Sequence, residues 1–292
     1  METSLAGFFA CTLRLDEDYK PVCKKQAVRF LAASIREIVV DLGLKGMKAI
    51  LAGASKGIGL ATAKTLAAEG CDVAICARGQ EGVDTAVAAL KALGVNASGA
   101  AVDMADGEAY RAWVAKAADG LGGCDIFISF ASAGGGPASE ENWKKVFDLD
   151  LLATFRGVEA AMPYLEKSKA GSIVAVASTA ALEDFFGPQA YNAMKAAVIN
   201  YASALSQKLA PTGIRVNTVS PGPVFIEGGA WDMIKTHMAP LYEQTIKAVP
   251  MGRLGTGEEV AQAIAFMASP ACPFMTGTNV VIDGGITKRV QY

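Results

Sequence analysis

"LAGASKGIGLATA", residues 51–63, places Gly53, Gly57 and Gly59 between an apolar run and a stretch with helical periodicity. Glycine inside regular structure costs about 0.5 to 1 kcal/mol relative to alanine, so three glycines at such a junction indicate a backbone with an unusual task. The apolar run 49–52 is typical of a buried strand. The sequence therefore predicts a strand, a glycine-rich turn and a helix, and the rest of the chain decides what the turn does.

Short apolar segments alternate with helical stretches along most of the chain. Strands are expected at 47–52, 72–77, 97–102, 124–129, 171–178, 214–220 and 278–283, and helices at 57–69, 82–93, 107–119, 140–166, 188–210 and 257–268. Fully apolar strands separated by helices predict a parallel sheet covered on both faces. The fold class is α/β, a doubly wound (Rossmann) sheet in a single domain, and its glycine turn is suited to a pyrophosphate.

Composition excludes several classes of partner. The chain has 292 residues, of which 52% are hydrophobic, and this is ample for a core. Its 27 basic and 29 acidic residues give a net charge of −2, with no basic footprint for nucleic acid or for a membrane surface. No apolar run reaches the roughly 18 to 20 residues that cross a bilayer. We expect neither a nucleic acid nor a membrane as partner.

The cysteines are scattered, at positions 11, 23, 71, 76, 124 and 272, without a CxxC pair. Several fall in apolar runs, where cysteine acts as a small hydrophobe. This usage predicts a reduced, cytoplasmic protein without a metal site. The opening residues 1–13 lack a basic leader and make a poor signal peptide.

Residues 1–43 form an N-terminal extension ahead of a Rossmann-fold domain, 44–292. Within it, 24–40 carries apolar residues at helical spacing and predicts one amphipathic helix. The extension could contact a partner or another subunit, or it could have no role. We favour the second interpretation because the segment encodes no chemistry.

Six short motifs resemble the short-chain dehydrogenases/reductases over about residues 44–285. They are "AGASKGIG" (52–59), "VDMAD" (102–106), Ser178, "YNAMK" (191–195), "SPGPV" (220–224) and "VIDGG" (281–285). Their order and spacing are specific, since Ser178 precedes Tyr191 by 13 residues, as the active site of that family requires. The resemblance includes the NADP-preferring 3-oxoacyl reductase-like members and implies an enzyme acting on a CH–OH group with NAD(P).

The candidate catalytic residues suit proton transfer to or from an oxygen. Tyr191 and Lys195 are four residues apart on a predicted helix and therefore share a face. A neighbouring ammonium favours the phenolate form of a tyrosine. Ser178 can hydrogen-bond to the substrate oxygen, while a nicotinamide supplies or accepts the hydride.

Charge predicts NADP(H) rather than NAD(H) as the cofactor. An acidic residue at the end of the second strand would bind the 2′-hydroxyl of NAD, whereas Ala77 occupies that place and Arg78 follows it. Lys56 adds a second cation, although both cations could instead be ordinary surface charges. The resemblance implies cofactor contacts at Gly53, Ser55, Lys56, Gly57, Ile58, Gly59, Arg78, Asp103, Met104, Phe130, Ala131, Tyr191, Lys195, Pro221, Gly222 and Val224. Asp103 could alternatively cap a helix.

Two departures from the family pattern affect catalytic detail. Members usually carry Asn-Asn-Ala-Gly after the fourth strand, where this chain has 129–132, "SFAS". The asparagine that completes the proton relay aligns with Asp150, which we include among the catalytic candidates. Asp150 could point away and pair elsewhere. Our hypothesis is that it is ionised and coupled to Lys195.

The segment of about 223–250 is rich in Met, Ile and aromatic residues and predicts a lid over an apolar ketone or secondary alcohol. His237, the only histidine of the chain, is expected to be a solvated lid residue. The resemblance implies a homotetramer or homodimer. The alternative function is a dinucleotide-binding sensor or structural paralogue with weak or no activity; the retained Ser178, Tyr191 and Lys195 favour the enzyme.

Overall fold

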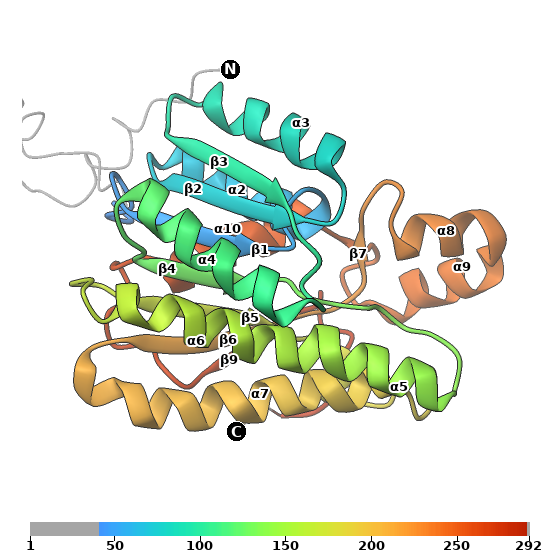
Figure 1. The fold of residues 1–292 in the computed structure, drawn as a ribbon. Helices are drawn as coiled ribbons and strands as arrows, with labels where there is room; N and C mark the ends of the chain where they lie inside the picture. The colour runs from blue at the N-terminus through green and yellow to red at the C-terminus, as the bar shows by residue number, and fades with distance from the viewer. Residues whose placement is uncertain (1–40, 291–292) are drawn as a thin grey trace, which may run out of the picture. The chain divides into compact units, whose positions relative to one another are not determined.

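The computed structural model describes residues 41–290, and the described residues from Leu42 onward belong to one compact unit. The helix expected at 24–40 lies outside the described residues. Seven parallel strands form one sheet in the order β3-β2-β1-β4-β5-β6-β9, which confirms the predicted doubly wound α/β fold (Figure 1). The strands are β1 (Lys48–Ala52), β2 (Asp72–Ala77), β3 (Ala97–Ala101), β4 (Ile126–Ser129), β5 (Ser172–Val176), β6 (Arg215–Pro221) and β9 (Asn279–Ile282).

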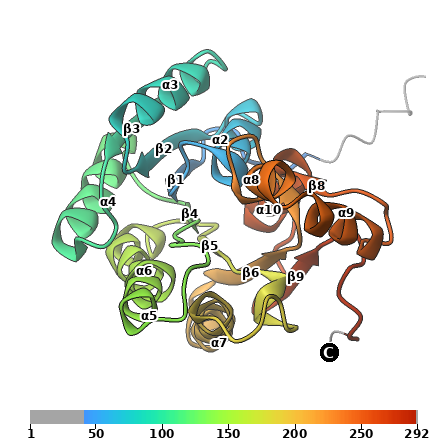
Figure 2. The same ribbon diagram turned by 90° about the vertical axis from the view of Figure 1, so that its right-hand side faces the viewer.

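Helices cover both faces of this sheet (Figure 2). One face packs against α2 (Gly57–Ala68), α3 (Gln80–Lys91) and α10 (Gly257–Ala268), and the other against α4 (Gly107–Leu121), α6 (Ala153–Leu165) and α7 (Ala190–Leu209). The order of strands reverses between β1 and β4. In an open α/β sheet, ligands bind beyond the carboxyl ends of the strands at this reversal.

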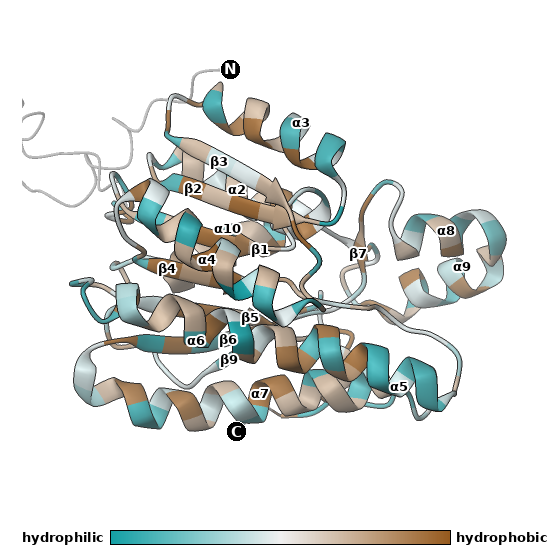
Figure 3. Ribbon diagram, in the orientation of Figure 1, coloured by the Kyte–Doolittle hydropathy of each residue, from teal (hydrophilic) through white to brown (hydrophobic). Residues whose placement is uncertain are grey.

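The strands are apolar throughout because each one supplies side chains to two cores. Leu51 and Ile128 pack in the core under α2 and α10, while their neighbours Ile50 and Phe127 pack in the core under α4 and α6. All four side chains are fully buried. The hydropathy colouring in Figure 3 shows this apolar sheet between helices whose outward faces are more polar.

The described cysteines, Cys71, Cys76, Cys124 and Cys272, are buried and free, as expected of small hydrophobes. Burial raises the pKa of the Cys71 and Cys76 thiols to about 12, so both stay protonated near neutral pH. Among residues 41–290 no cluster of His, Cys, Asp or Glu is suited to a metal ion. None of the helices in that range has the length and apolar character to cross a membrane.

The expected single helix 140–166 is wrong in one respect. The structure divides it into α5 (Glu140–Val146), a π-helical segment (Phe147–Leu152) and α6. Hydrophobic periodicity cannot detect a wider turn of this length, and π segments often occur at functional sites. Asp150 lies in the π-helical segment and is fully buried.

The predicted lid region contains β7 (Val224–Phe225), α8 (Ala230–His237) and α9 (Ala239–Ala248). Strand β7 pairs with β8 (Gly255–Thr256), apart from the main sheet. Figure 1 shows α8 and α9 beyond the carboxyl ends of the sheet strands. The two helices therefore lie at the end of the domain where a ligand is expected.

Candidate active site

A cavity of about 680 Å³ opens at the carboxyl ends of the strands, beside the glycine-rich turn. We call it the turn cavity. Most of the predicted cofactor residues line it: Gly53, Ser55, Lys56, Gly57, Ile58, Gly59, Arg78, Met104, Phe130, Tyr191, Lys195, Pro221, Gly222 and Val224. It is also lined by residues that the sequence analysis missed, among them Gly79, Gly82, Val176 and Ile226. Two signals were available: Gly79 follows Arg78, and Ile226 lies in the predicted lid segment 223–250.

The glycine turn lets helix and strand approach more closely than a side chain permits. Gly53 and Gly57 have φ values of +84° and +59°, which lie in the left-handed region. A Cβ at Gly59 would lie 2.5 Å from the carbonyl oxygen of Gly53 and 2.8 Å from the Cα of Ala54. Helix α2 starts after Lys56 without a side-chain cap. Its first N–H groups are thus available to an anion, and the turn fits a pyrophosphate.

Lys56 and Arg78 are both exposed at the turn cavity, and neither makes an ion pair with another residue of 41–290. Their charges are free to meet an anionic group of a ligand. Glu227 is a carboxylate in the lining of the same cavity.

Asp103 does not line the turn cavity, whereas its neighbour Met104 does. The Asp103 carboxylate accepts a hydrogen bond from the Ala105 N–H at 3.0 Å, which fixes the turn before α4. The alternative of Asp103 as a helix cap is wrong, because Asp106 is the N-cap of α4. The capping residue lies three positions later in the same motif.

The candidate catalytic residues come from two elements that lie side by side. Tyr191 and Lys195 occupy the first two turns of α7, and the Lys195 ammonium is 5.7 Å from the centre of the Tyr191 ring. Ser178 follows β5, and its hydroxyl accepts the Ala180 N–H at 3.1 Å. All three side chains line the turn cavity. The helical spacing of Tyr191 and Lys195 and the position of Ser178 after β5 therefore place all three side chains on one wall of the turn cavity.

The Lys195 ammonium is surrounded by oxygen atoms. It donates hydrogen bonds to the carbonyl oxygens of Ala131 at 3.1 Å and Val176 at 3.0 Å, and it lies 3.1 Å from Asp150 Oδ1 in an ion pair. The second carboxylate oxygen of Asp150 accepts the Ala133 N–H at 2.7 Å. The alternative that Asp150 points away from Lys195 is therefore wrong. Ala131 and Asp150 do not line the turn cavity. Both contact the ammonium group of Lys195, which does line it.

The unusual segment 129–132 keeps the end of β4 in place by other contacts. The Ser129 hydroxyl lies 2.9 Å from the Thr154 hydroxyl, which in turn donates to the carbonyl oxygen of Asp150. Phe130 lines the turn cavity and also packs against the core under α2. The departure from Asn-Asn-Ala-Gly thus leaves a hydrogen-bonded link between β4 and the π-helical segment.

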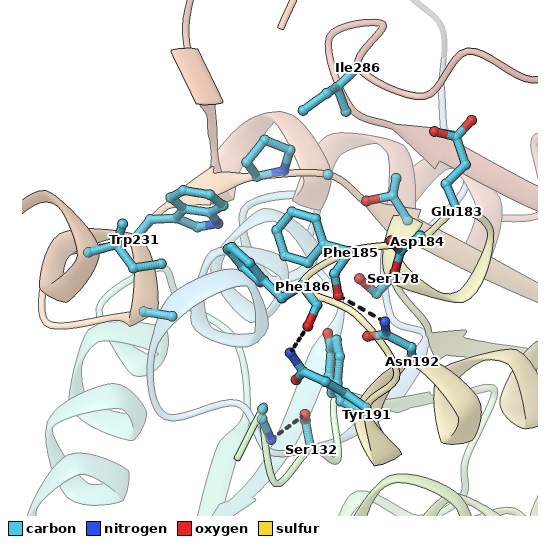
Figure 4. A pocket seen from close by; sticks show the side chains of 18 of the residues that line it. Ser132, Ser178, Glu183, Asp184, Phe185, Phe186, Tyr191, Asn192, Trp231 and Ile286 are labelled. Carbon is cyan, nitrogen blue, oxygen red and sulfur yellow. Dashed lines mark hydrogen bonds between the residues drawn. The ribbon is translucent and has the colours of Figure 1, made fainter. Parts of the chain in front are cut away.

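A second pocket of about 630 Å³ adjoins the turn cavity, and we call it the aromatic pocket (Figure 4). The two share Ser132, Ser178, Tyr191, Gly222, Ala230 and Trp231. Of the predicted lid residues, Trp231 and Ile234 line the aromatic pocket, while Met233, Met238 and His237 are exposed. Ser178 and Tyr191 consequently stand where the two spaces meet.

Phe186 in the aromatic pocket has an unusual backbone. Its φ of +59° makes it the one non-glycine residue of 41–290 with a positive φ. A bulky residue in this region costs about 1 to 3 kcal/mol, and such strain is concentrated at functional sites. The carbonyl oxygens of Phe185, Phe186 and Gly187 accept hydrogen bonds from the side-chain amides of Asn192 and Gln189. These bonds hold the strained segment against the start of α7.

A second tyrosine on α7 differs from Tyr191 in its surroundings. Burial raises the pKa of Tyr201 to about 12, with a further contribution from the Glu159 carboxylate. Its hydroxyl has no hydrogen-bond partner within residues 41–290. Tyr201 therefore stays protonated at neutral pH and lines neither the turn cavity nor the aromatic pocket.

Comparison with known proteins places the chain in one family. Residues 53–287 match the family model described as enoyl-(acyl carrier protein) reductase. The chain is 36% identical over 259 residues to isoepoxydon dehydrogenase of Aspergillus clavatus, covering 87% of this chain and all of that protein. It is 34% identical over 249 residues to a 3-oxoacyl-[acyl-carrier-protein] reductase of Vibrio cholerae, covering 84% and 99%. A solved L-sorbose reductase from Gluconobacter frateurii, in complex with NADPH and L-sorbose, superposes with a TM-score of 0.79 at 28% identity, covering 86% and 100%.

The buried ion pair yields a prediction about stability. Asp150→Leu removes the counter-ion of Lys195 and the acceptor for the Ala133 N–H, so we expect the free energy of unfolding to fall by about 3 kcal/mol. Asp150→Asn keeps an oxygen acceptor and should cost less than half as much. Urea denaturation followed by circular dichroism measures both values. Equal losses for the two variants would contradict the importance of the oxygen acceptor.

Proposed function

Because this chain belongs to the short-chain dehydrogenase/reductase family, whose members act on alcohols and ketones with NAD(P)(H), we propose that it interconverts a ketone and a secondary alcohol of an apolar small molecule with NADP(H). One observation carries the proposal. Ser178 and Tyr191 stand where the turn cavity meets the aromatic pocket, with Lys195 beside Tyr191. A cofactor in the first space and a substrate in the second would meet at these hydroxyl groups.

The turn cavity would hold the cofactor. The uncapped start of α2 and the glycine turn are suited to the pyrophosphate, and Lys56 with Arg78 to the 2′-phosphate that distinguishes NADP from NAD. Pro221, Gly222 and Val224 would form the wall beside the nicotinamide ring. When bound, the nicotinamide supplies the hydride for reduction and accepts it in oxidation.

This chain's own residues would handle the proton. Ser178 donates a hydrogen bond to the substrate oxygen, and the Tyr191 hydroxyl gives its proton to that oxygen as the alcohol forms. In the oxidative direction Tyr191 takes the proton back. The Lys195 ammonium stabilises the phenolate that Tyr191 becomes, and Asp150 with two backbone carbonyls holds the ammonium in place.

We further propose a homotetramer or homodimer in the cytoplasm. Exposed Phe155 on α6, whose ring lies 6.1 Å from that of Tyr201 on α7, offers apolar surface for a second copy. The buried, unpaired thiols favour a reducing compartment.

The experiment that separates the enzyme from a dinucleotide-binding sensor is a ketone-reduction assay with NADPH. We expect turnover by the unmodified protein and a loss of at least 10³-fold in Tyr191→Phe, because the proton donor is gone while the ring remains. The dissociation constant of NADPH for Tyr191→Phe, measured by fluorescence titration, should differ less than threefold from that of the unmodified protein. Binding without turnover in the unmodified protein would establish the sensor instead.

Cofactor preference depends on the two free cations. Arg78→Ala should weaken NADPH binding by about tenfold or more, since it removes a charge-assisted contact to the 2′-phosphate, and should leave NADH binding nearly unchanged. Titration with both cofactors measures this. Equal weakening for NADPH and NADH would argue against a 2′-phosphate site at Arg78.

The Asp150 carboxylate predicts a shift in pH dependence. Its negative charge offsets part of the field by which the Lys195 ammonium favours the Tyr191 phenolate. Asp150→Asn should therefore remain active and move the rising limb of the alcohol-oxidation pH profile to lower pH. Asp148→Asn, in the same π-helical segment, is the matched control and should leave the profile in place. An unchanged profile in a folded, NADPH-binding Asp150→Asn variant would refute the coupling.

A further inference from the structure

The aromatic pocket has a wall of three rings that the proton transfer does not use. The ring centres of Phe185 and Phe186 are 4.2 Å apart, and that of Phe185 is 6.3 Å from that of Trp231. Figure 4 shows both phenylalanine rings pointing toward Trp231, which belongs to α8. Two segments about 45 residues apart in the sequence thus contribute to one aromatic surface next to Ser178 and Tyr191.

The backbone of this wall is arranged to present a ring, not to bury it. Three successive carbonyl oxygens, from Phe185 to Gly187, accept bonds of 2.9, 3.1 and 3.2 Å from Asn192 and Gln189. With these carbonyl groups bonded toward α7 and φ at +59°, Phe186 stays 51% exposed as a residue. Burial among residues 41–290 does not explain a strained backbone that leaves an apolar ring exposed. Contact with the ring of a ligand would explain it.

Another part of the pocket wall carries no bulky side chains. Gly134, Gly135 and Gly136 line it in succession. A Cβ at Gly136 would lie 2.5 Å from the Asn142 side-chain oxygen, and one at Gly135 would lie 3.2 Å from the Gln189 oxygen. A Cβ at Gly134 would meet no atom within 4 Å. The three glycines together leave this part of the wall without side chains, which suits a flat group.

The charges of the pocket disfavour an anion. Glu183 and Asp184 line it, and none of the described residues in its lining is basic. One oxygen of Glu183 accepts the backbone N–H groups of Lys288 and Arg289 at 2.8 and 3.1 Å, which fixes this carboxylate at the pocket edge. A negatively charged substrate would meet two carboxylates in the described lining of the pocket and no cation in that lining.

We propose that the aromatic pocket selects ketones and secondary alcohols that carry a planar ring beside the reacting carbon and no negative charge. The ring lies against Phe185, Phe186 and Trp231, and the oxygen faces Ser178 and Tyr191. This assignment of substrate class rests on the proposed ketone–alcohol activity. It makes Phe185 and Phe186 specificity-determining residues.

The test compares ketones of matched size with saturating NADPH. Acetophenone and 2-octanone are methyl ketones of eight carbon atoms each, and only the first has a planar ring. We expect kcat/KM to favour acetophenone by at least tenfold, since each aromatic contact contributes about two- to tenfold. 4-Acetylbenzoate adds a carboxylate to the same ring. We expect its kcat/KM to be at least tenfold lower than that of acetophenone.

Variants test whether the aromatic rings of the pocket cause the preference for acetophenone over 2-octanone. Phe186→Asn removes the ring and keeps a residue type that tolerates a positive φ. We expect it to reduce the preference for acetophenone five- to tenfold, mainly through KM, and to change 2-octanone reduction less than twofold. Phe185→Leu tests the neighbouring ring and replaces Phe186→Asn if that variant does not fold. Phe274→Asn, at a fully exposed phenylalanine outside both cavities, is the matched control. It should leave kcat/KM unchanged for both acetophenone and 2-octanone.

The outcomes separate this proposal from the activity on which it rests. NADPH binding without reduction of any of the three ketones overturns the proposed function and the substrate class together. Reduction of acetophenone and 2-octanone at equal efficiency, or a preference that persists in Phe186→Asn and Phe185→Leu, overturns the substrate class alone. Equal efficiency for acetophenone and 4-acetylbenzoate overturns the exclusion of anions.

Discussion

The arrangement of the candidate site depends on one buried ammonium group. Lys195 Nζ connects the carbonyl oxygen of Ala131, just after β4, with that of Val176 at the end of β5 and with the carboxylate of Asp150. A buried charge without partners is very unfavourable, so this set of oxygens fixes α7 relative to the two strand ends. Tyr191, one turn earlier on the same helix, takes its position from that anchor.

In the proposed mechanism, the carboxylate of Asp150 weakens the electrostatic effect of the Lys195 ammonium on Tyr191. A neutral amide at this position would leave the ammonium with its full charge toward Tyr191, whereas a carboxylate offsets part of that charge. The same carboxylate holds the Ala133 N–H and thereby the start of the glycine-rich segment that lines the aromatic pocket. The Asp150 side chain thus joins Lys195 to the segment that lines the aromatic pocket.

The two spaces at the carboxyl ends of the strands have opposite character. The turn cavity offers backbone N–H groups and exposed cations, which suit phosphates. The aromatic pocket offers rings, glycines and carboxylates, which suit an apolar group without negative charge. Ser178 and Tyr191 lie where the two spaces meet. A hydride donor bound in the turn cavity and a carbonyl group bound in the aromatic pocket would therefore come together at these two residues.

Local sequence determined the fold and most of the turn cavity because their signals are short-range. Apolar strands, helical spacing and the glycines at 53, 57 and 59 each act within a few residues, and Tyr191 with Lys195 needs only one helical turn. Tertiary structure alone decided the rest. The contact of Asp150 with Lys195 depends on a π-helical segment that periodicity does not encode, and the aromatic wall joins Phe185 to Trp231 through the packing of α8. The amides of Gln189 and Asn192, a few residues along the chain, hold the positive-φ segment around Phe186, but the aromatic surface that includes its ring exists only because Trp231 of α8 packs beside Phe185.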